Sequence, residues 1–231
     1  MKLKKLDFNE ERYAKPWHQL PEDQHRIKKI IEIVGQNKRV LDVGCYDGSI
    51  SKLLLPNKNE VYGVDISEKA VELAKLNGIQ AFTCDIEDKL PFLDNFFDVV
   101  VAGEIIEHIF DVDNFLNEIN RILKIGGYLV LTTPNLACFN SRWRLLLGKN
   151  PYNIETSLGS NSAGHIRYFV KNSLSELLKA HGLTIDVFAS DIVQYGANRY
   201  SVILARLFPT FGMTLIVKAI KNVEEAKGAI Q

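Results

Sequence analysis

The sequence is poor in cysteine, carries no excess charge of either sign and contains no long apolar run. Its three cysteines include no pair in C-x-x-C spacing and are too few for a disulfide framework. Basic and acidic residues both total 28, so no basic field favours a nucleic-acid partner. No apolar stretch approaches the roughly 20 residues of a membrane-spanning helix, and residues 1–11 lack an apolar signal segment. These absences predict a cytoplasmic protein without a transmembrane segment.

Strand-like and helix-like segments alternate along the 231 residues, of which 46% are hydrophobic. This length and composition predict one domain, residues 1–231, with a full core. The alternation predicts an α/β fold, a doubly wound and mostly parallel sheet with helices on both faces. Strands are expected at residues 39–43, 60–65, 80–84, 98–102, 183–189 and 214–220, with another after the Gly126-Gly127 turn. Helices are expected at residues 21–36, 49–55, 113–123 and 173–181, and from a Ser67 cap to Leu76.

Two acidic residues lie at the carboxyl ends of neighbouring predicted strands and are separated by 65 − 42 = 23 positions. Asp42 begins a turn with Gly44 and Gly48, and Asp65 ends the next strand. In a doubly wound sheet, adjacent parallel strands bring their carboxyl ends together, so both acids should point into one crevice. A carboxylate at the end of the second strand can accept hydrogen bonds from both hydroxyls of a ribose. The pattern therefore predicts a site for a cofactor that contains a nucleoside.

The turn after the first strand argues against a dinucleotide cofactor. A pyrophosphate site needs G-x-G-x-x-G, whereas this turn has the bulky Tyr46 inside it and no third glycine at the required spacing. An adenosyl group that carries an amino acid and a sulfonium fits better, because Asp42 and nearby carbonyls can meet cationic groups. A nucleotide-dependent oxidoreductase remains as a disfavoured alternative.

The segment Asp42–Gly48 resembles the first motif of the class I S-adenosylmethionine-dependent methyltransferases, acid-x-Gly-x-Gly-x-Gly, with Tyr46 in place of the second glycine. Asp65-Ile66 is similar to the second motif, Thr83–Ile86 to the third, and residues 90–104 and 126–135 to the fourth and fifth strands. The resemblance implies a seven-stranded Rossmann-like sheet with the last strand antiparallel, and S-adenosylmethionine as cofactor. It implies these cofactor-binding residues: Asp42, Gly44, Cys45, Tyr46, Gly48, Asp65, Ile66, Asp85, Ile86 and Glu104.

The segment Gly103–His108 follows the fourth strand and holds the predicted catalytic residues, His108 and Glu107. A hydroxyl acceptor attacks poorly while protonated, so its methylation needs a base, and an imidazole can take a proton at neutral pH. The alternative is that His108 only orders the loop. Glu104 is expected to face the methionine moiety, and His165 and Arg167 are expected to face the substrate.

The same residues also suggest a metal site. Glu104, Glu107, His108 and His165 resemble the Glu-x-x-Glu-His set, with a later His, by which small-RNA 2′-O-methyltransferases hold a divalent ion. Similar loops occur in ubiquinone-pathway O-methyltransferases, and the balanced charge argues against RNA. We therefore expect no metal and a small-molecule acceptor, most plausibly a hydroxyl of a sugar, quinone-type or lipid-linked compound. A catalytically silent binding module and a metal-assisted RNA 2′-O-methyltransferase are the alternatives.

Two stretches interrupt the alternation of strands and helices. Residues 38–134 form the predicted cofactor-binding half, and residues 135–165 and 192–213 are the predicted substrate-side insertions. The first combines Arg142 and Arg144 with Trp143 and leucines, and the second is rich in aromatic and aliphatic residues. Each either packs a short helix on the core or forms a lid for a partly apolar acceptor, which could be presented at a membrane surface. The oligomeric state, the pathway and the acceptor itself stay open.

Overall fold

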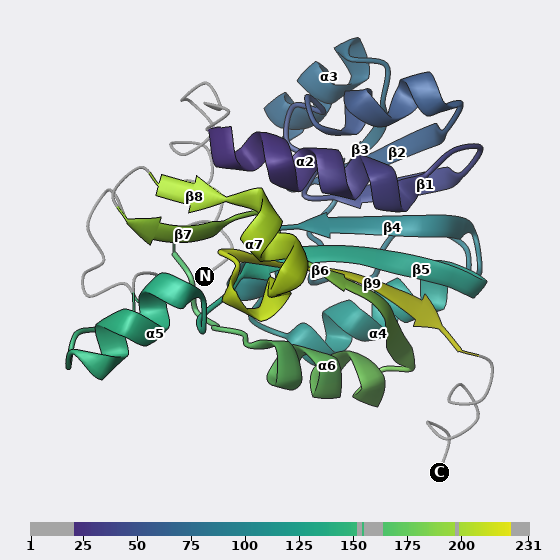
Figure 1. Cartoon of the computed structure of the whole chain (residues 1–231). Helices are drawn as coiled ribbons and strands as arrows, with labels where there is room; N and C mark the ends of the chain where they lie inside the picture. Colours follow the sequence, from purple (N-terminus) through teal and green to yellow (C-terminus); the bar gives the residue numbers. More distant parts are fainter. Residues whose placement is uncertain (1–20, 152–153, 155–163, 197–198, 223–231) are drawn as a thin grey trace.

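The computed structural model describes residues 21–151, 154, 164–196 and 199–222, which form a large sheet with helices on both faces (Figure 1). Its seven strands lie in the order β3-β2-β1-β4-β5-β9-β6, and β9 is antiparallel to both of its neighbours while the other pairs are parallel. The predicted doubly wound sheet with an antiparallel last strand is therefore confirmed. The strands are β1 (Arg39–Val43), β2 (Glu60–Asp65), β3 (Gln80–Thr83), β4 (Phe97–Gly103), β5 (Leu123–Pro134), β6 (Leu183–Ala189) and β9 (Thr214–Lys221).

Helices and short 3₁₀ turns lie before and between the strands along the chain. The helices and 3₁₀ turns are α2 (Pro21–Val34), η1 (Ser51–Asn57), α3 (Glu68–Leu76), η2 (Ile106–His108), α4 (Val112–Ile122), α5 (Phe139–Leu146), α6 (Lys171–Ala180), α7 (Val202–Leu207) and η3 (Pro209–Phe211). The short hairpin strands β7 (Val193–Gly196) and β8 (Arg199–Ser201) form a separate sheet. Figure 1 shows α5, β7, β8 and α7 together at the end of the molecule toward which β4 points. No helix of the described residues is long and apolar enough to cross a bilayer.

The buried side chains form two clusters, because successive residues of a strand point to opposite faces. Val99 and Val101 pack with α2, η1 and α3, whereas Val100 and Ala102 pack with α4 and α6. Burial on both faces explains why β4 is a nearly continuous run of valines. The cores hold the parallel strands in register, which fixes the carboxyl edge where the predicted site lies.

Most predicted elements agree with the structure to within two residues, and three differ for local reasons. The expected helix at 49–55 is a 3₁₀ turn, η1, that contains Pro56. The expected helix start at Ser173 is wrong: α6 begins at Lys171, and the Ser173 hydroxyl accepts a hydrogen bond from the Val170 N–H at 3.2 Å. Strand β5 begins at Leu123 and includes the two glycines that were expected as a turn, with an irregular register against β4.

Helix α4 begins with an N-cap, Asp111, whose contribution to stability can be measured. The Asp111 carboxylate accepts a hydrogen bond from the Asn114 N–H at 3.0 Å, and α4 then buries five apolar residues against the sheet. We expect Asp111→Ala to lower the free energy of unfolding by about 1 kcal/mol, because the capped N–H loses its partner. Urea denaturation measures the change. Asp111→Asn keeps a capping oxygen and should lose much less; an equal loss in both variants would contradict the capping role.

Candidate active site

The three predicted acids lie at the same edge of the sheet. Register pairs Asp42 with Gly63 and Asp65 with Thr83, so the acids follow one another across β1, β2 and the residues after β3. Asp85 comes two residues after the end of β3, and its Oδ1 accepts a hydrogen bond from the Glu87 N–H at 3.1 Å. The acids therefore do not scatter over separate surfaces.

Asp42 is buried against the start of η1. Its Oδ2 accepts a hydrogen bond from the Ser51 hydroxyl at 2.5 Å. Burial raises the pKa of Asp42 to about 6, with the Ser51 hydrogen bond opposing this and the charge of Asp65 adding to it. The carboxyl group thus ties the glycine turn to the chain that follows it.

Asp65 holds the glycine turn from the neighbouring strand. Its two carboxylate oxygens accept hydrogen bonds from the N–H groups of Tyr46 and Ser67, both at 3.0 Å. Burial raises the pKa of Asp65, and these backbone hydrogen bonds oppose the shift. Each carboxylate oxygen has a second lone pair, so Asp65 can accept further hydrogen bonds from a ligand.

The glycine turn keeps a left-handed backbone even where it has no glycine. Gly44 and Gly48 have φ values of +73° and +75°, and Tyr46 has a φ of +49°. This conformation costs a residue with a side chain about 1–2 kcal/mol, and the hydrogen bond to Asp65 helps to hold it. Tyr46 therefore adopts a backbone conformation that glycine favours. Gly44 is needed for a second reason, because a Cβ at this position would overlap Ile105 Cδ1.

Glu104 is also left-handed, with a φ of +55°, and it lies directly after β4. Its Oε1 accepts a hydrogen bond from the Thr132 hydroxyl at 2.9 Å. The same oxygen forms an ion pair with Nη1 of Arg26, a residue of α2, at 3.2 Å. Burial raises the pKa of Glu104, and the charge of Arg26 opposes this. Sequence analysis missed Arg26, because nothing in an amphipathic helix marks which cation turns toward the sheet.

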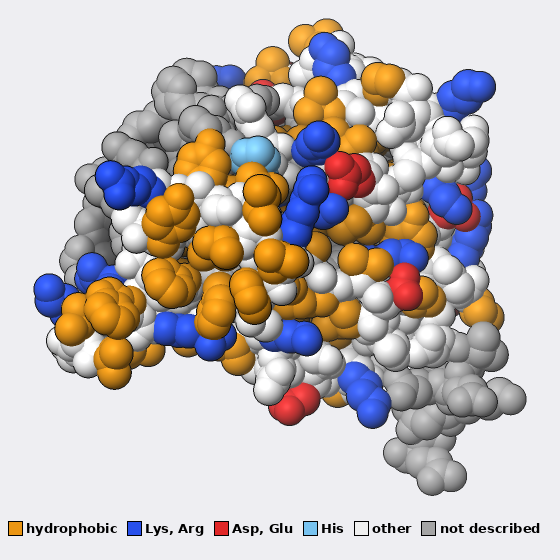
Figure 2. All heavy atoms as spheres, in the orientation of Figure 1, with side chains coloured by type: hydrophobic (Ala, Val, Ile, Leu, Met, Phe, Trp, Pro, Cys, Tyr) orange, Lys and Arg blue, Asp and Glu red, His pale blue; other side chains and the backbone are white. Residues whose placement is uncertain are grey.

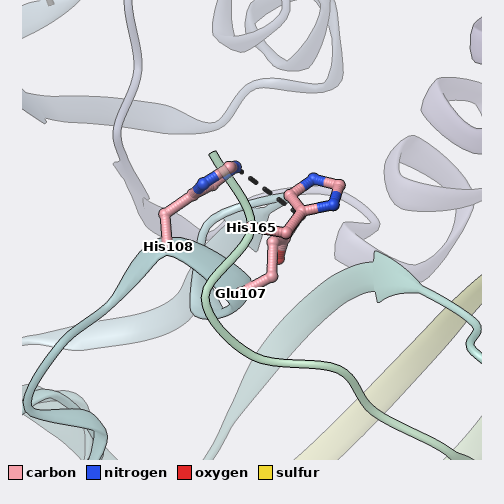
Figure 3. Close-up of side chains that lie close together, drawn as sticks. All are labelled: Glu107, His108 and His165. Carbon is pink, nitrogen blue, oxygen red and sulfur yellow. Dashed lines mark ion pairs between the residues drawn. The ribbon is translucent and has the colours of Figure 1, made fainter. Parts of the chain in front are cut away.

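Glu107, His108 and His165 come together although 57 positions separate His108 from His165 (165 − 108). One potential ligand atom from each lies within 4.8 Å of the others, and Figure 3 shows His165 on a neighbouring segment beside the other two. The Glu107 and His165 segments are joined because the Glu107 carbonyl accepts hydrogen bonds from the N–H groups of Ile166 and Arg167.

The orientation of His108 follows from its contacts. Its Nδ1 lies 3.2 Å from the Gly164 carbonyl oxygen, and a carbonyl can only accept, so Nδ1 carries a proton and, in the neutral imidazole, Nε2 keeps its lone pair. That Nε2 lies 4.0 Å from Glu107 Oε1. The imidazole is thus fixed in the tautomer that a base or a metal ligand at Nε2 requires.

Glu107 is 1% exposed, and its two oxygens differ. Oε2 accepts a hydrogen bond from the Thr133 hydroxyl at 3.0 Å, whereas Oε1 has no hydrogen-bond partner in the described part of the chain. Burial raises the pKa of Glu107 to about 8, and the charge of Glu104 adds to this. A perturbed carboxyl group with a spare oxygen is a feature of functional sites. Threonines at the end of β5 were not singled out by the sequence analysis.

The donor atoms of Glu107, His108 and His165 would also suit a divalent metal ion. Glu104, the fourth member of the set suggested by the sequence, is paired with Arg26 and Thr132 and lies outside the described cluster. A bound ion would lower the pKa of a hydroxyl group that approached it.

Arg167 makes contacts with the loop that follows η2. Its Nε and Nη2 donate hydrogen bonds to the carbonyl oxygens of Ile109 and Phe110, at 3.1 and 2.7 Å. The guanidinium group therefore steadies the residues directly after η2, the 3₁₀ turn that carries Glu107 and His108. Its contact with a substrate stays a prediction.

A family model described as a methyltransferase domain matches residues 11–187 of this chain. The chain belongs to the class I S-adenosylmethionine-dependent methyltransferases. The order of its sheet agrees with this, and S-adenosylmethionine is the cofactor of the family. The recognition made from the sequence motifs is confirmed.

Relatives of this methyltransferase include proteins named ubiquinone biosynthesis O-methyltransferase. The one from Nitrosomonas europaea is 31% identical over 52% of this chain and 54% of its own length, so the chain spans about half of that relative. The one from Chromobacterium violaceum is 24% identical over 76% of each chain.

One solved structure with the same fold contains S-adenosylhomocysteine. It is a Burkholderia thailandensis 1,6-didemethyltoxoflavin-N1-methyltransferase with bound 1,6-didemethyltoxoflavin and S-adenosylhomocysteine. The TM-score is 0.59 at 18% identity, and the match covers 87% of this chain and 80% of that one. At this identity the likeness shows the fold alone.

Gly44 tests whether the glycine turn needs both its backbone angle and its open space. We expect Gly44→Ala to lower the free energy of unfolding by about 1–3 kcal/mol, because the cost of moving the Ile105 side chain adds to the left-handed strain. Gly148→Ala is the control, since Gly148 has a φ of +69° but nothing within 4 Å of an added Cβ. Urea denaturation of both variants measures the difference. Equal losses would show that Ile105 imposes no constraint.

The raised pKa of Glu107 predicts that the stability of the protein depends on pH. The folded protein keeps a proton on Glu107 up to a pKa of about 8, whereas the unfolded chain releases it near 4.5, so this group makes stability fall as pH rises between these values. Glu107→Gln should therefore raise the free energy of unfolding at about pH 8 by about 1–3 kcal/mol, with a smaller gain at about pH 5.

Glu118 provides a control of the opposite sign for that experiment. Its hydrogen bonds with Arg121 lower the pKa of Glu118, so its ionised form stabilises the fold above its unfolded pKa and this contribution is lost as pH falls. Glu118→Gln should therefore lose stability at about pH 8 in urea denaturation. A pH profile of Glu107→Gln parallel to that of the unmodified protein would contradict the raised pKa.

Proposed function

We propose that this methyltransferase transfers the methyl group of S-adenosylmethionine to a hydroxyl oxygen of a small molecule. The observation that carries the proposal is the pairing of the buried Glu107 with the partly exposed His108, whose Nε2 lies 4.0 Å from Glu107 Oε1. The relatives named O-methyltransferases support oxygen as the acceptor atom. The contacts of Asp65 with the glycine turn support retained cofactor binding, and Tyr46 inside that turn disfavours a nucleotide-dependent oxidoreductase.

The cofactor would lie along the carboxyl edge of β1, β2 and β4. In this proposal Asp65 accepts hydrogen bonds from the ribose hydroxyls, and Asp85 and Ile86 contact the adenine. The methionine part lies near Glu104, whose charge favours the ammonium and sulfonium groups. The remaining proposed contacts are Asp42, Gly44, Cys45, Tyr46, Gly48 and Ile66.

The proposed chemical step moves one proton and one methyl group. The acceptor hydroxyl gives its proton to His108 Nε2 as its oxygen forms a bond to the methyl carbon. The carbon–sulfur bond breaks at the same time, and sulfur keeps the electron pair, which leaves neutral S-adenosylhomocysteine. The imidazolium that forms is next to Glu107, so its charge favours ionisation of that carboxyl group. Alignment in a pocket without water supplies the rest of the acceleration.

The acceptor side is the proposed role of residues 135–165 and 192–213, within a single domain of residues 1–231. His165 and Arg167 are the proposed substrate residues. The many apolar side chains of both insertions suit a quinone-type or lipid-linked acceptor better than a free sugar. Cys45, Cys84 and Cys138 are unpaired thiols, which is compatible with the proposed location in the cytoplasm.

Two substitutions separate binding of the cofactor from chemistry. We expect Asp65→Ala to weaken S-adenosylhomocysteine binding in isothermal titration calorimetry by about tenfold or more, because the ribose loses a charged acceptor. His108→Ala should leave that affinity unchanged and lower kcat by about 10²–10⁴-fold with phenolic and other hydroxyl acceptors. S-adenosylhomocysteine release measures turnover.

An exposed acid serves as the control for loss of charge. Asp186→Ala removes a carboxylate of β6 that pairs with Lys218 and should change neither quantity. Unchanged affinity in Asp65→Ala would contradict the ribose contact, and full turnover in His108→Ala would contradict the base. If dialysis against EDTA abolishes turnover and Mg²⁺ restores it, the metal-assisted mechanism replaces the proton transfer proposed here.

A further inference from the structure

Two segments beyond the sheet expose a group of large apolar side chains. We call this group the apolar surface. Figure 2 shows hydrophobic side chains, in orange, gathered over the region where Figure 1 places α5 and α7. Leu146 and Ile203 are 75% and 70% exposed, which is far beyond what packing on a core requires. The apolar surface consists of Phe139, Trp143, Leu145, Leu146, Leu147, Ile203, Leu204, Leu207 and Phe208.

The two segments are bound to each other and form one surface. Arg142 of α5 donates a hydrogen bond to the Thr210 carbonyl of η3 at 3.3 Å, and its guanidinium lies 4.7 Å from the centre of the Phe211 ring. The rings of Phe139 and Phe211 have centroids 6.1 Å apart. The Asn135 side-chain amide also donates to the Thr210 carbonyl. These contacts hold α5 against η3, which begins two residues after the end of α7.

The charge of these segments is of one sign. Residues 136–151 and 192–213 contain Arg142, Arg144, Lys149, Arg199 and Arg206 and no aspartate or glutamate. The whole chain, by contrast, has equal numbers of basic and acidic residues. Cationic residues that border exposed tryptophan, phenylalanine and leucine are typical of surfaces that insert into the headgroup region of an anionic bilayer.

We propose that the apolar surface docks this protein onto the surface of a bilayer that contains anionic lipids. Arginine and lysine side chains extend alongside the apolar residues and can reach lipid phosphates while their aliphatic stems remain in the apolar layer. Trp143 suits the same boundary, because an indole has an apolar ring and one N–H donor. A second copy of the chain would bring like charges together and fits this surface less well.

Docking in this way would direct the acceptor side of the site toward the membrane. Thr133, which donates a hydrogen bond to Glu107, lies near the end of β5, and α5 begins six residues after it. The lipid contact does not depend on the proposed methyl transfer. It would, however, let the enzyme take an acceptor directly from the lipid phase.

Vesicle flotation tests the apolar contribution. The full chain is mixed with vesicles of phosphatidylcholine alone, or of phosphatidylcholine with phosphatidylglycerol, without cofactor. We expect binding to the anionic vesicles, and about a tenfold or greater loss of binding in Leu146→Glu and in Ile203→Glu, since each puts a charge into the apolar layer. Leu76→Glu on α3 is the matched control, because Leu76 is 85% exposed but lies outside the apolar surface.

The contribution of charge is tested with paired substitutions. Arg199→Gln with Arg206→Gln should weaken binding to anionic vesicles and reduce its dependence on salt. Lys69→Gln with Lys75→Gln on α3 removes the same charge elsewhere and should have little effect. S-adenosylhomocysteine binding and circular dichroism confirm that each variant is folded.

Three outcomes would overturn the proposal. The first is the absence of binding to anionic vesicles by the unmodified chain. The second is equal loss of binding in Leu76→Glu and Leu146→Glu. The third is a dimer in analytical ultracentrifugation that Leu146→Glu dissociates, because the apolar surface would then be an interface between copies. Flotation needs no turnover, so a failed methylation assay leaves the vesicle results as a separate measurement.

Discussion

The burial of carboxyl groups at the carboxyl edge of the parallel sheet is the constraint on which the site depends. Each group loses water and needs a replacement partner, since an uncompensated buried charge is costly. Asp42 has the Ser51 hydroxyl, Asp65 has two backbone N–H groups, and Glu104 has Arg26 and Thr132. These partners come from η1, the glycine turn, α2 and β5, so meeting the constraint joins separate parts of the chain around one edge. Glu107 accepts a hydrogen bond from the Thr133 hydroxyl and its second oxygen has no hydrogen-bond partner among the described residues, so burial favours its protonated form and that oxygen can bind a ligand.

Strained backbone is found at the same edge. Tyr46 and Glu104 both have positive φ values without being glycine, and both follow strands that end there. Strain of this kind persists only where the surroundings over-determine the conformation. The Tyr46 N–H is held by Asp65, and the Glu104 N–H donates to the Thr132 carbonyl at 3.0 Å. The carboxyl groups and the strained turns therefore support each other and fix the backbone at this edge of the sheet.

The family model matches residues 11–187, a range that includes the first insertion and ends before the second. Loops at the carboxyl ends of the strands can vary while the core keeps its packing, which is how one fold serves many acceptors. The apolar surface is built from segments of both insertions, each of which follows a strand of the large sheet.

The sequence by itself determined the order of strands and helices, because hydrophobic periodicity and glycine turns are local signals. Strands β1, β2 and β6 have the predicted bounds, and the positions of Asp42, Asp65 and Asp85 after successive strands followed from motif spacing. Only the tertiary structure decided which side chains compensate the acids. The pairing of Arg26 with Glu104 and the approach of His165 to His108 join residues 78 and 57 positions apart (104 − 26 and 165 − 108). Such contacts depend on how whole elements pack, and local sequence patterns carry no record of that packing.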